Sequence, residues 1–161
     1  MRVLLIAPTL KYREYPQLLS LSDFPSGLAY LASSLKQAGH EVFGCNPNNI
    51  VGYVNGQAML KAVIPQSIVQ TKPDIIGLGG ICTDYPFLND AIGIIRSISP
   101  NVPIVLGGQI VTNDAEDVFN LLKPDYAISG EGEEAIVNLL EWIPKKESIP
   151  PPFNLWYWRE E

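Results

Sequence analysis

Glycine pairs recur in this 161-residue sequence directly after short apolar runs. Gly79–Gly80 follows Ile75–Leu78, Gly107–Gly108 follows Ile104–Leu106, and a third segment, Ser129–Gly132, carries glycine at alternate positions. Because glycine has no side chain, the backbone or flat ring of a ligand can approach such segments closely, whereas the segments offer little acid–base chemistry. The spacing therefore predicts a binding floor rather than a catalytic centre.

The candidate ligand-binding residues lie where the apolar runs end. An alternative interpretation is that the glycine pairs only let the chain turn sharply out of a strand, but their common position at one edge favours a ligand. The acidic run Glu131–Glu134 is typical of a helix start, where it complements the dipole. The full set of candidates is Thr9, Leu10, Gly79, Gly80, Ile81, Cys82, Thr83, Gly107, Gly108, Gln109, Ser129, Gly130, Glu131 and Gly132.

Residues that could hold a metal ion or act as nucleophiles are few. The chain has two cysteines, Cys45 and Cys82, and one histidine, His40. These are too few soft ligands for a closed zinc or iron–sulfur site. We expect no catalytic residue and no protein-built metal site, with both cysteines reduced and His40 in a turn.

Five short apolar runs alternate with helical patterns, which is typical of βαβ units around a parallel sheet buried on both faces. The predicted fold is α/β, a doubly wound five-stranded parallel sheet in the flavodoxin-like order 2-1-3-4-5. In such sheets ligands bind at the carboxyl ends of the strands. The expected strands are Val3–Ala7, Val42–Cys45, Ile75–Leu78, Ile104–Leu106 and Tyr126–Ser129.

The first two helices are expected over Gly27–Ala38 and near Gln57–Gln70. Apolar residues of the first fall at i, i+3, i+4 and i+7, which places them on one face. In the second, Pro65 removes a backbone donor and predicts a break.

The remaining helices carry start signals. Asp84 is the expected N-cap of the third helix, and Asn113 with Glu116 forms a possible capping box for the fourth. The last helix is expected to open at Gly130–Glu134, with acidic residues in its first turn.

Two segments do not fit this alternation. Residues 8–25 form an unusually long connection with several tyrosines and leucines, typical of a functional loop or a local core. Residues 144–161 are rich in proline and aromatic residues, and Phe153–Trp158 predicts a strand that needs a covering surface. We therefore expect an α/β domain over residues 1–143 and a linker toward a missing downstream domain over residues 144–161.

Composition narrows the partners. Eleven Lys and Arg against seventeen Asp and Glu give a net charge of −6, and Lys145–Lys146 is the largest basic cluster, so nucleic acid is an unexpected partner. The apolar runs are too short for a membrane span, and Met1–Pro8 is typical of a strand rather than a signal peptide. We expect a soluble cytoplasmic protein.

The sequence lacks the residues that several known functions of this fold require. A phosphoacceptor receiver needs aspartates after strands one and three and a lysine after strand five, where Pro8, Gly79 and Gly130 lie instead. The segment after strand one, Pro8–Lys11, is neither a flavodoxin phosphate loop nor a G-x-G-x-x-G turn, and no Walker sequence occurs.

An ordered set of segments resembles a known family. These segments are Leu28–Ala32 leading to Ala38–Val42, then Pro73–Leu78, Val105–Gly108 and Pro124–Glu133, ending in Gly-Glu-Gly-Glu. Together they resemble the amino-terminal cobalamin-binding domain of cobalamin-dependent radical S-adenosylmethionine proteins, of the anaerobic magnesium-protoporphyrin IX monomethyl ester oxidative cyclase type.

The resemblance implies a module that binds cobalamin in its base-off form. The D-x-H-x-x-G motif of other cobalamin domains, whose histidine ligates cobalt, is absent, and His40 is expected at the opposite edge of the sheet. The C-x-x-x-C-x-x-C cluster motif is also absent, so a 4Fe-4S cluster, S-adenosylmethionine and any catalysis would belong to a downstream domain of the same polypeptide. The alternative is a flavodoxin-like protein-interaction domain with no cofactor.

Overall fold

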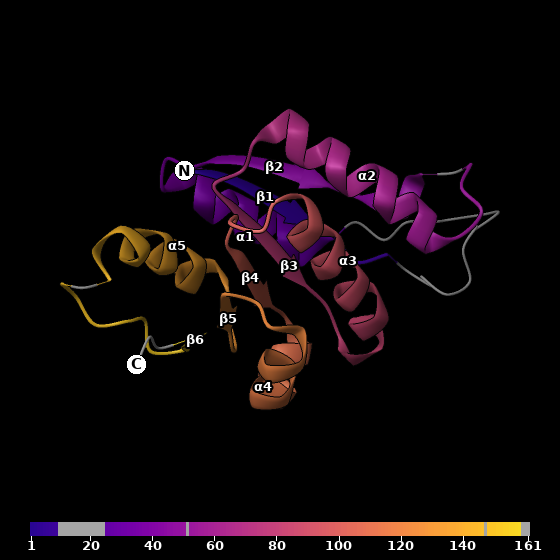
Figure 1. Ribbon diagram of the computed structural model, residues 1–161. Coiled ribbons are helices and arrows are strands. Elements are labelled where there is room, and N and C mark those ends of the chain that lie inside the picture. The colour runs from indigo at the N-terminus through magenta and orange to yellow at the C-terminus, as the bar shows by residue number, and fades with distance from the viewer. Residues whose placement is uncertain (10–24, 51, 147, 159–161) are drawn as a thin grey trace.

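The computed structural model describes residues 1–9, 25–50, 52–146 and 148–158. Helices cover both faces of one sheet, which gives three layers (Figure 1). The five predicted strands are all present, each shifted by at most one residue at either end. The strands are β1 (Arg2–Ile6), β2 (Glu41–Cys45), β3 (Ile75–Gly79), β4 (Ile104–Gly107), β5 (Tyr126–Ile128) and β6 (Leu155–Tyr157).

The sheet order is β2-β1-β3-β4-β5-β6. The first five strands are parallel and confirm the predicted order. The prediction of five strands is wrong by one, because β6 pairs antiparallel with β5 and places Trp156 opposite Ala127. A three-residue strand has too little local pattern to reveal its partner, which lies far away in the sequence. The order reverses between β1 and β3, so the ligand-binding edge is expected there.

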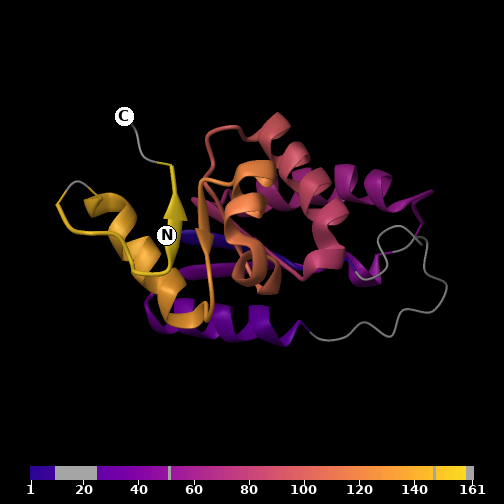
Figure 2. The ribbon, with the colours of Figure 1, turned by 90° about the horizontal axis from the view of Figure 1, so that it is seen from below.

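The helices are α1 (Ser26–Gln37), α2 (Gly56–Thr71), α3 (Tyr85–Ile98), α4 (Gln109–Leu122) and α5 (Glu133–Trp142). Viewed from below, α1 and α5 lie on the face opposite α2 and α3 (Figure 2). Successive side chains along each strand point to opposite faces of the sheet, so the strands contribute residues to two hydrophobic cores. Leu4 and Ile76 pack with α2, α3 and α4, whereas Leu5 and Ile75 pack with α1 and α5.

Pro65 does not break α2, contrary to the prediction, and the helix is continuous from Gly56 to Thr71. Proline removes the N–H that would bond to the carbonyl of Lys61, but Lys61 is exposed on the solvent side of the helix. Apolar packing on both sides of the proline outweighs the lost hydrogen bond, through Met59, Leu60, Val63, Ile64 and Ile68.

The fourth helix begins at Gln109 rather than after a capping box at Asn113 and Glu116, so that prediction is wrong. Asp114 has φ −140° and ψ 52°, which kinks the helix after one turn. Ile110 is 2% exposed and holds this extra turn against the core. Burial of Ile110 and of the neighbouring Val111, which is fully buried, therefore places the helix start close to the strand.

Part of the carboxyl-terminal segment packs on the domain. The Trp158 indole N–H donates to the carbonyl of Pro124 (2.8 Å), and its ring lies 4.5 Å from that of Phe119. The Trp142 indole N–H donates to the carbonyl of Ile149 (3.0 Å). The predicted aromatic strand thus finds its covering surface on β5 and α4, while the boundary at residue 143 stays a prediction.

A repeated Lys-Pro-Asp sequence fixes the amino-terminal edge of the sheet. Asp74, before β3, accepts a hydrogen bond from the Arg2 amide (2.7 Å) and donates its own amide to the Arg2 carbonyl (2.8 Å). Asp125, before β5, makes the same reciprocal pair with Ile104, at 2.6 Å and 3.0 Å. The preceding lysines, Lys72 and Lys123, both end their helices in the left-handed conformation. Each aspartate therefore sets the start of a neighbouring strand.

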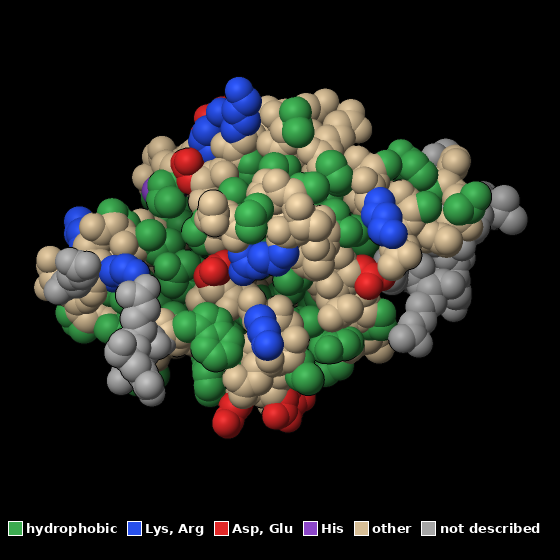
Figure 3. Space-filling view, in the orientation of Figure 1, with side chains coloured by type: hydrophobic (Ala, Val, Ile, Leu, Met, Phe, Trp, Pro, Cys, Tyr) green, Lys and Arg blue, Asp and Glu red, His purple; other side chains and the backbone are tan. Residues whose placement is uncertain are grey.

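No helix within the described ranges has the length and hydropathy needed to cross a bilayer. On the face drawn in Figure 3, lysine and arginine side chains are scattered among hydrophobic and neutral ones.

Candidate functional site

A groove of about 370 Å³ lies between α1 and α5, over the carboxyl ends of β3, β4 and β5. This volume is in the range of small-molecule sites. Its lining combines glycine backbone with aliphatic side chains, and its charged residues are Glu131 and Glu133. The lining residues are Leu5, Pro8, Pro25, Gly27, Leu28, Leu31, Gly77, Leu78, Gly79, Gly80, Ile81, Val105, Leu106, Gly107, Gly108, Gln109, Ile128, Gly130, Glu131, Gly132, Glu133 and Ile136.

Glycines, which have no side chain beyond a hydrogen atom, create this groove. Residues at alternate positions of a strand point to the same face, so Gly77 and Gly79 of β3 follow Ile75 on the α1 and α5 side. In β4, Gly107 follows Val105 on that same side. The sheet surface therefore changes from large aliphatic residues to bare backbone as the strands approach their carboxyl ends.

Two glycines keep the groove open against its own walls. A Cβ atom on Gly77 would lie 2.7 Å from Cδ2 of Leu5, and one on Gly132 would lie 2.9 Å from Cδ2 of Leu31. Both distances are below ordinary contact, so a side chain at either position would displace its neighbour into the groove. Leu28 and Leu31 belong to the predicted apolar face of α1 but remain half-exposed, because the groove runs beneath them.

Hydrogen bonds tie the glycine loops into one continuous rim. The amide of Ile110 donates to the carbonyl of Gly80 (3.1 Å), which joins the loops after β3 and β4. Thr112 Oγ1 accepts from the amide of Gly130 (2.9 Å) and donates to the carbonyl of Gly108 (3.3 Å), which joins the loops after β4 and β5. The rim is therefore positioned before any ligand arrives.

Asp84 lies before α3, as predicted, but its carboxylate does not cap that helix. Oδ2 instead accepts from the amide of Ile81 (2.9 Å). A Cβ atom on Gly80 would lie 2.6 Å from this oxygen. Gly80 therefore lets Asp84 fold back and fix the short 3-10 helix Cys82–Asp84 at the rim.

The groove brings together nine of the fourteen candidate residues, namely Gly79, Gly80, Ile81, Gly107, Gly108, Gln109, Gly130, Glu131 and Gly132. Cys82 and Thr83 lie exposed on the adjoining 3-10 helix. Ser129 lies next to the carboxyl-terminal segment, where its carbonyl accepts from Asn154 Nδ2 (2.9 Å). Thr9 is 3% exposed, and its Oγ1 has no partner among the described residues. Leu10 and most of the long 8–25 connection lie outside the described residues.

Sequence reasoning missed the aliphatic walls and the deepest glycine. The sequence predicts Leu5, Val105 and Ile128 only as core strand residues, yet they form the floor of the groove. Gly77 sits inside an apolar run, and its alternation with Ile75 and Gly79 was the signal that could have identified it.

Titratable side chains with perturbed pKa values lie away from the groove. His40 lies in the turn between α1 and β2, and its Nδ1 accepts from the amino terminus (3.3 Å) at the edge opposite the rim, as predicted. Partial burial and the neighbouring amino terminus lower the pKa of His40. Within the described parts of the chain, no group of three His, Cys, Asp or Glu side chains is arranged to hold a metal ion.

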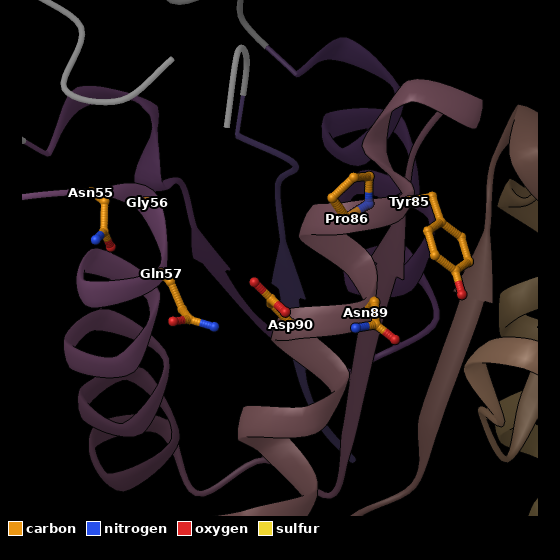
Figure 4. Close-up of a pocket in the computed structure, with 7 residues that line it drawn as sticks. All are labelled: Asn55, Gly56, Gln57, Tyr85, Pro86, Asn89 and Asp90. Atoms are coloured by element: carbon orange, nitrogen blue, oxygen red, sulfur yellow. The ribbon is translucent and has the colours of Figure 1, made fainter. Parts of the chain in front are cut away.

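A second hollow, of about 490 Å³, has a different character. It lies between the first turns of α2 and α3, where Gln57 and Asp90 point toward one another (Figure 4). Asn55 and Asn89 add further amides to its lining. Because Asn55 already caps α2 by accepting from the Ala58 amide (2.8 Å), we interpret this hollow as a polar junction between two helices.

Comparison with solved structures finds the same fold in two radical enzymes. TsrM, a radical S-adenosylmethionine methyltransferase from Kitasatospora setae solved with cobalamin and a [4Fe-4S] cluster, matches 96% of this chain with TM-score 0.69 and 19% identity. OxsB, a cobalamin-dependent S-adenosylmethionine radical enzyme solved with aqua-cobalamin and S-adenosylmethionine, matches 99% with TM-score 0.69 and 18% identity. The chain spans 26% of TsrM and 21% of OxsB.

Comparison with curated protein sequences finds no match. The family model described as the B12 binding domain matches residues 23–140, from just before α1 to the last turn of α5. That range contains the whole glycine rim, all of α1 and most of α5, the two helices that wall the groove. Because the model covers most of the sequence, the chain belongs to the B12-binding domain family.

Proposed function

We propose that this domain holds cobalamin in the base-off form, without a histidine ligand to cobalt. The nucleotide tail would enter the groove between α1 and α5, and the corrin ring would lie over the glycine rim. The observation that carries the proposal is that an apolar groove opens through bare backbone at the carboxyl edge of a B12-binding domain. When bound, the cofactor supplies a cobalt centre able to accept and pass on a methyl group.

The residues present fit such a cofactor. The glycine cradle at Gly77 and Gly132 leaves room that a Cβ atom would remove. Aliphatic walls suit an aromatic base, and a rim of backbone suits a broad ring that needs close approach. The rim candidates Thr9, Cys82, Thr83 and Ser129 stay part of the proposal as residues around the ring rather than in the groove.

The base-off form follows from the position of the histidine. His40 is the chain's only histidine, and it lies at the far edge of the sheet beside Met1. No imidazole of this chain can therefore take the lower position on cobalt. If the tail occupies the groove, its own base is also withdrawn from the metal.

Electron paramagnetic resonance of the cobalt(II) form tests this assignment. We expect a titration to show binding, with no nitrogen superhyperfine splitting from an axial ligand. Splitting that survives His40→Ala would mean that the cofactor's own base stays coordinated. Splitting abolished by that substitution would mean that His40 reaches the cobalt, and either result would overturn the base-off assignment.

We also propose that the domain serves a radical S-adenosylmethionine enzyme of the oxidative cyclase type in the cytoplasm. The fold shared with TsrM and OxsB, and the small share of each that the chain spans, support a module within a larger polypeptide. A downstream domain would then supply the 4Fe-4S cluster and S-adenosylmethionine. A reading frame that continues past Glu161 into a C-x-x-x-C-x-x-C motif would support this proposal, and a stop codon there would contradict it.

A further inference from the structure

Among the residues that the structure describes, those at the deep end of the groove offer a ligand almost no polar partner. Its floor is Leu5, Val105 and Ile128, which are 3%, 3% and 5% exposed, and its walls are Leu31 and Ile136. The polar side chains of the lining, Gln109, Glu131 and Glu133, belong to loops and helix starts at the mouth.

The backbone of the groove floor also offers a ligand few free hydrogen-bonding groups. Gly77 is paired with Val105, and Gly79 with Gly107, in the ladder between β3 and β4. Val105 is also paired with Tyr126 of β5. Because the sheet already uses these N–H and C=O groups, a base lying on the floor contacts methyl groups and satisfied backbone.

We propose that this groove selects corrinoids by the chemistry of their lower base, accepting a benzimidazole and disfavouring a purine. The inference rests on the proposed function, because it requires the nucleotide tail to enter the groove. A dimethylbenzimidazole withdrawn from cobalt exposes one free ring nitrogen and two methyl groups. An adenine exposes several ring nitrogens and an amine, each of which would lose water without gaining a partner.

The same reasoning identifies Leu31 as a specificity residue. Leu31 is partly buried and packs against the core beside the groove, so glutamine, a side chain of similar length, keeps part of this packing and places an amide beside the base. Leu31→Gln should therefore help a purine and harm a benzimidazole. Tyr30→Gln is the matched control, because Tyr30 is on the same helix, 66% exposed and outside the lining.

Equilibrium titration of the 161-residue chain with three corrinoids tests the proposal: cobalamin, its adeninyl analogue, and cobinamide, which lacks the tail. We expect cobalamin to bind at least about tenfold more tightly than the adeninyl form, since unpaired buried polar groups carry penalties of this order. Cobinamide should also bind less tightly than cobalamin. Leu31→Gln should reduce the ratio of the affinity for cobalamin to that for the adeninyl analogue, and Tyr30→Gln should leave this ratio unchanged.

The outcomes separate the two proposals. Equal affinity for cobalamin and the adeninyl form, or cobinamide binding as tightly as cobalamin, would overturn base selection while corrinoid binding survives. Failure of all three corrinoids to bind would overturn the proposed function together with this inference. The comparison on the unsubstituted chain stands even if Leu31→Gln folds poorly.

Discussion

Gly108 lies with its backbone directly against that of Gly80. A Cβ atom on Gly108 would lie 2.7 Å from the Gly80 carbonyl oxygen and 2.9 Å from its amide nitrogen. Gly108 also has φ 88° and ψ −176°, a conformation essentially restricted to glycine. The first glycine of each pair, Gly79 or Gly107, lines the groove, and a Cβ atom on Gly79 would also lie 3.0 Å from the Gly107 carbonyl oxygen. The second, Gly80 or Gly108, brings two loops together, which supports the turn interpretation of the pairs, whereas the ligand interpretation stays a prediction.

We predict that Gly108→Ala destabilises the domain by about 3 kcal/mol or more, because it combines backbone strain with a clash against backbone. Gly107→Ala is the matched control, since its Cβ atom would lie 3.9 Å from the nearest non-neighbouring atom, the Ile128 carbonyl oxygen. Urea unfolding of both variants measures the difference. Similar losses of unfolding free energy in the two variants would contradict the backbone contact.

Much of the fold was predictable because a parallel sheet buried on both faces leaves a plain signal. Continuous apolar runs such as Ile75–Leu78 identify the strands whichever face each side chain meets. Features that depend on partners distant in the sequence could not be predicted. The helix through Pro65 and the extra turn before Asp114 both depend on burial against the sheet.

The site was predictable in its rim and not in its walls. A glycine directly after a buried strand indicates a sharp turn or a close approach to the backbone, so the position of Gly79 and Gly107 in the sequence is enough to predict them as rim residues. Leu31 and Ile136 carry the same apolar pattern whether they pack on the sheet or face a groove. The missing side chains at Gly77 and Gly132 decide between those outcomes, and their proximity to the leucines is visible only in the folded structure.

The two Lys-Pro-Asp sequences make unequal contributions, and we predict that Asp125→Ala costs more stability than Asp74→Ala. Asp125 Oδ2 accepts from the amide of fully buried Ile104 and also from Arg96 Nη2 (2.7 Å). The Asp74 carboxylate accepts from the Arg2 amide in an exposed hydrogen bond. We expect losses of about 2 and 1 kcal/mol, because an unpaired buried amide costs more than an exposed one.

Chemical denaturation of both variants measures this difference, and Asp125→Asn refines it. The amide oxygen of asparagine can still accept from Ile104, so this variant should lose less than Asp125→Ala. Equal losses for Asp74→Ala and Asp125→Ala would show that burial of Ile104 does not govern the effect.

Alkaline pH should weaken the fold through Cys45. Burial raises the pKa of the Cys45 thiol above its ordinary value of 9.0, against a smaller opposing effect of a hydrogen bond with Ser67. The folded state then holds the proton more tightly than the unfolded state, so this contribution is complete below 9.0 and is lost as pH rises above it. Burial also raises the pKa of Tyr126, and this phenol adds a loss of the same sign above 10.0.

Unfolding free energies measured from neutral to alkaline pH check the Cys45 contribution. Cys45→Ala should remove the part of the decline that begins near 9.0, on top of a pH-independent packing loss. Alkylation gives a second readout, since exposed Cys82 should react before buried Cys45 in the native protein. If Cys45 is labelled as fast as Cys82 in the native protein, the Cys45 thiol is not buried, and the predicted pH dependence loses its cause.

Filling the groove should abolish cofactor binding without unfolding the domain. Leu28 lines the groove from α1 and is partly buried against the core, so Leu28→Trp can extend its indole into the open space of the groove. We expect the affinity for cobalamin to fall at least about tenfold, because the indole takes the volume that the base needs. The unfolding free energy should fall by no more than about 1 kcal/mol, because part of the Leu28 packing is lost while the added indole enters open space. Tyr30→Trp, on the exposed side of the same helix, controls for the added indole and should bind normally. Spectroscopic titration of the two variants side by side decides the matter: if Leu28→Trp binds cobalamin as tightly as Tyr30→Trp, the tail does not occupy the groove between α1 and α5.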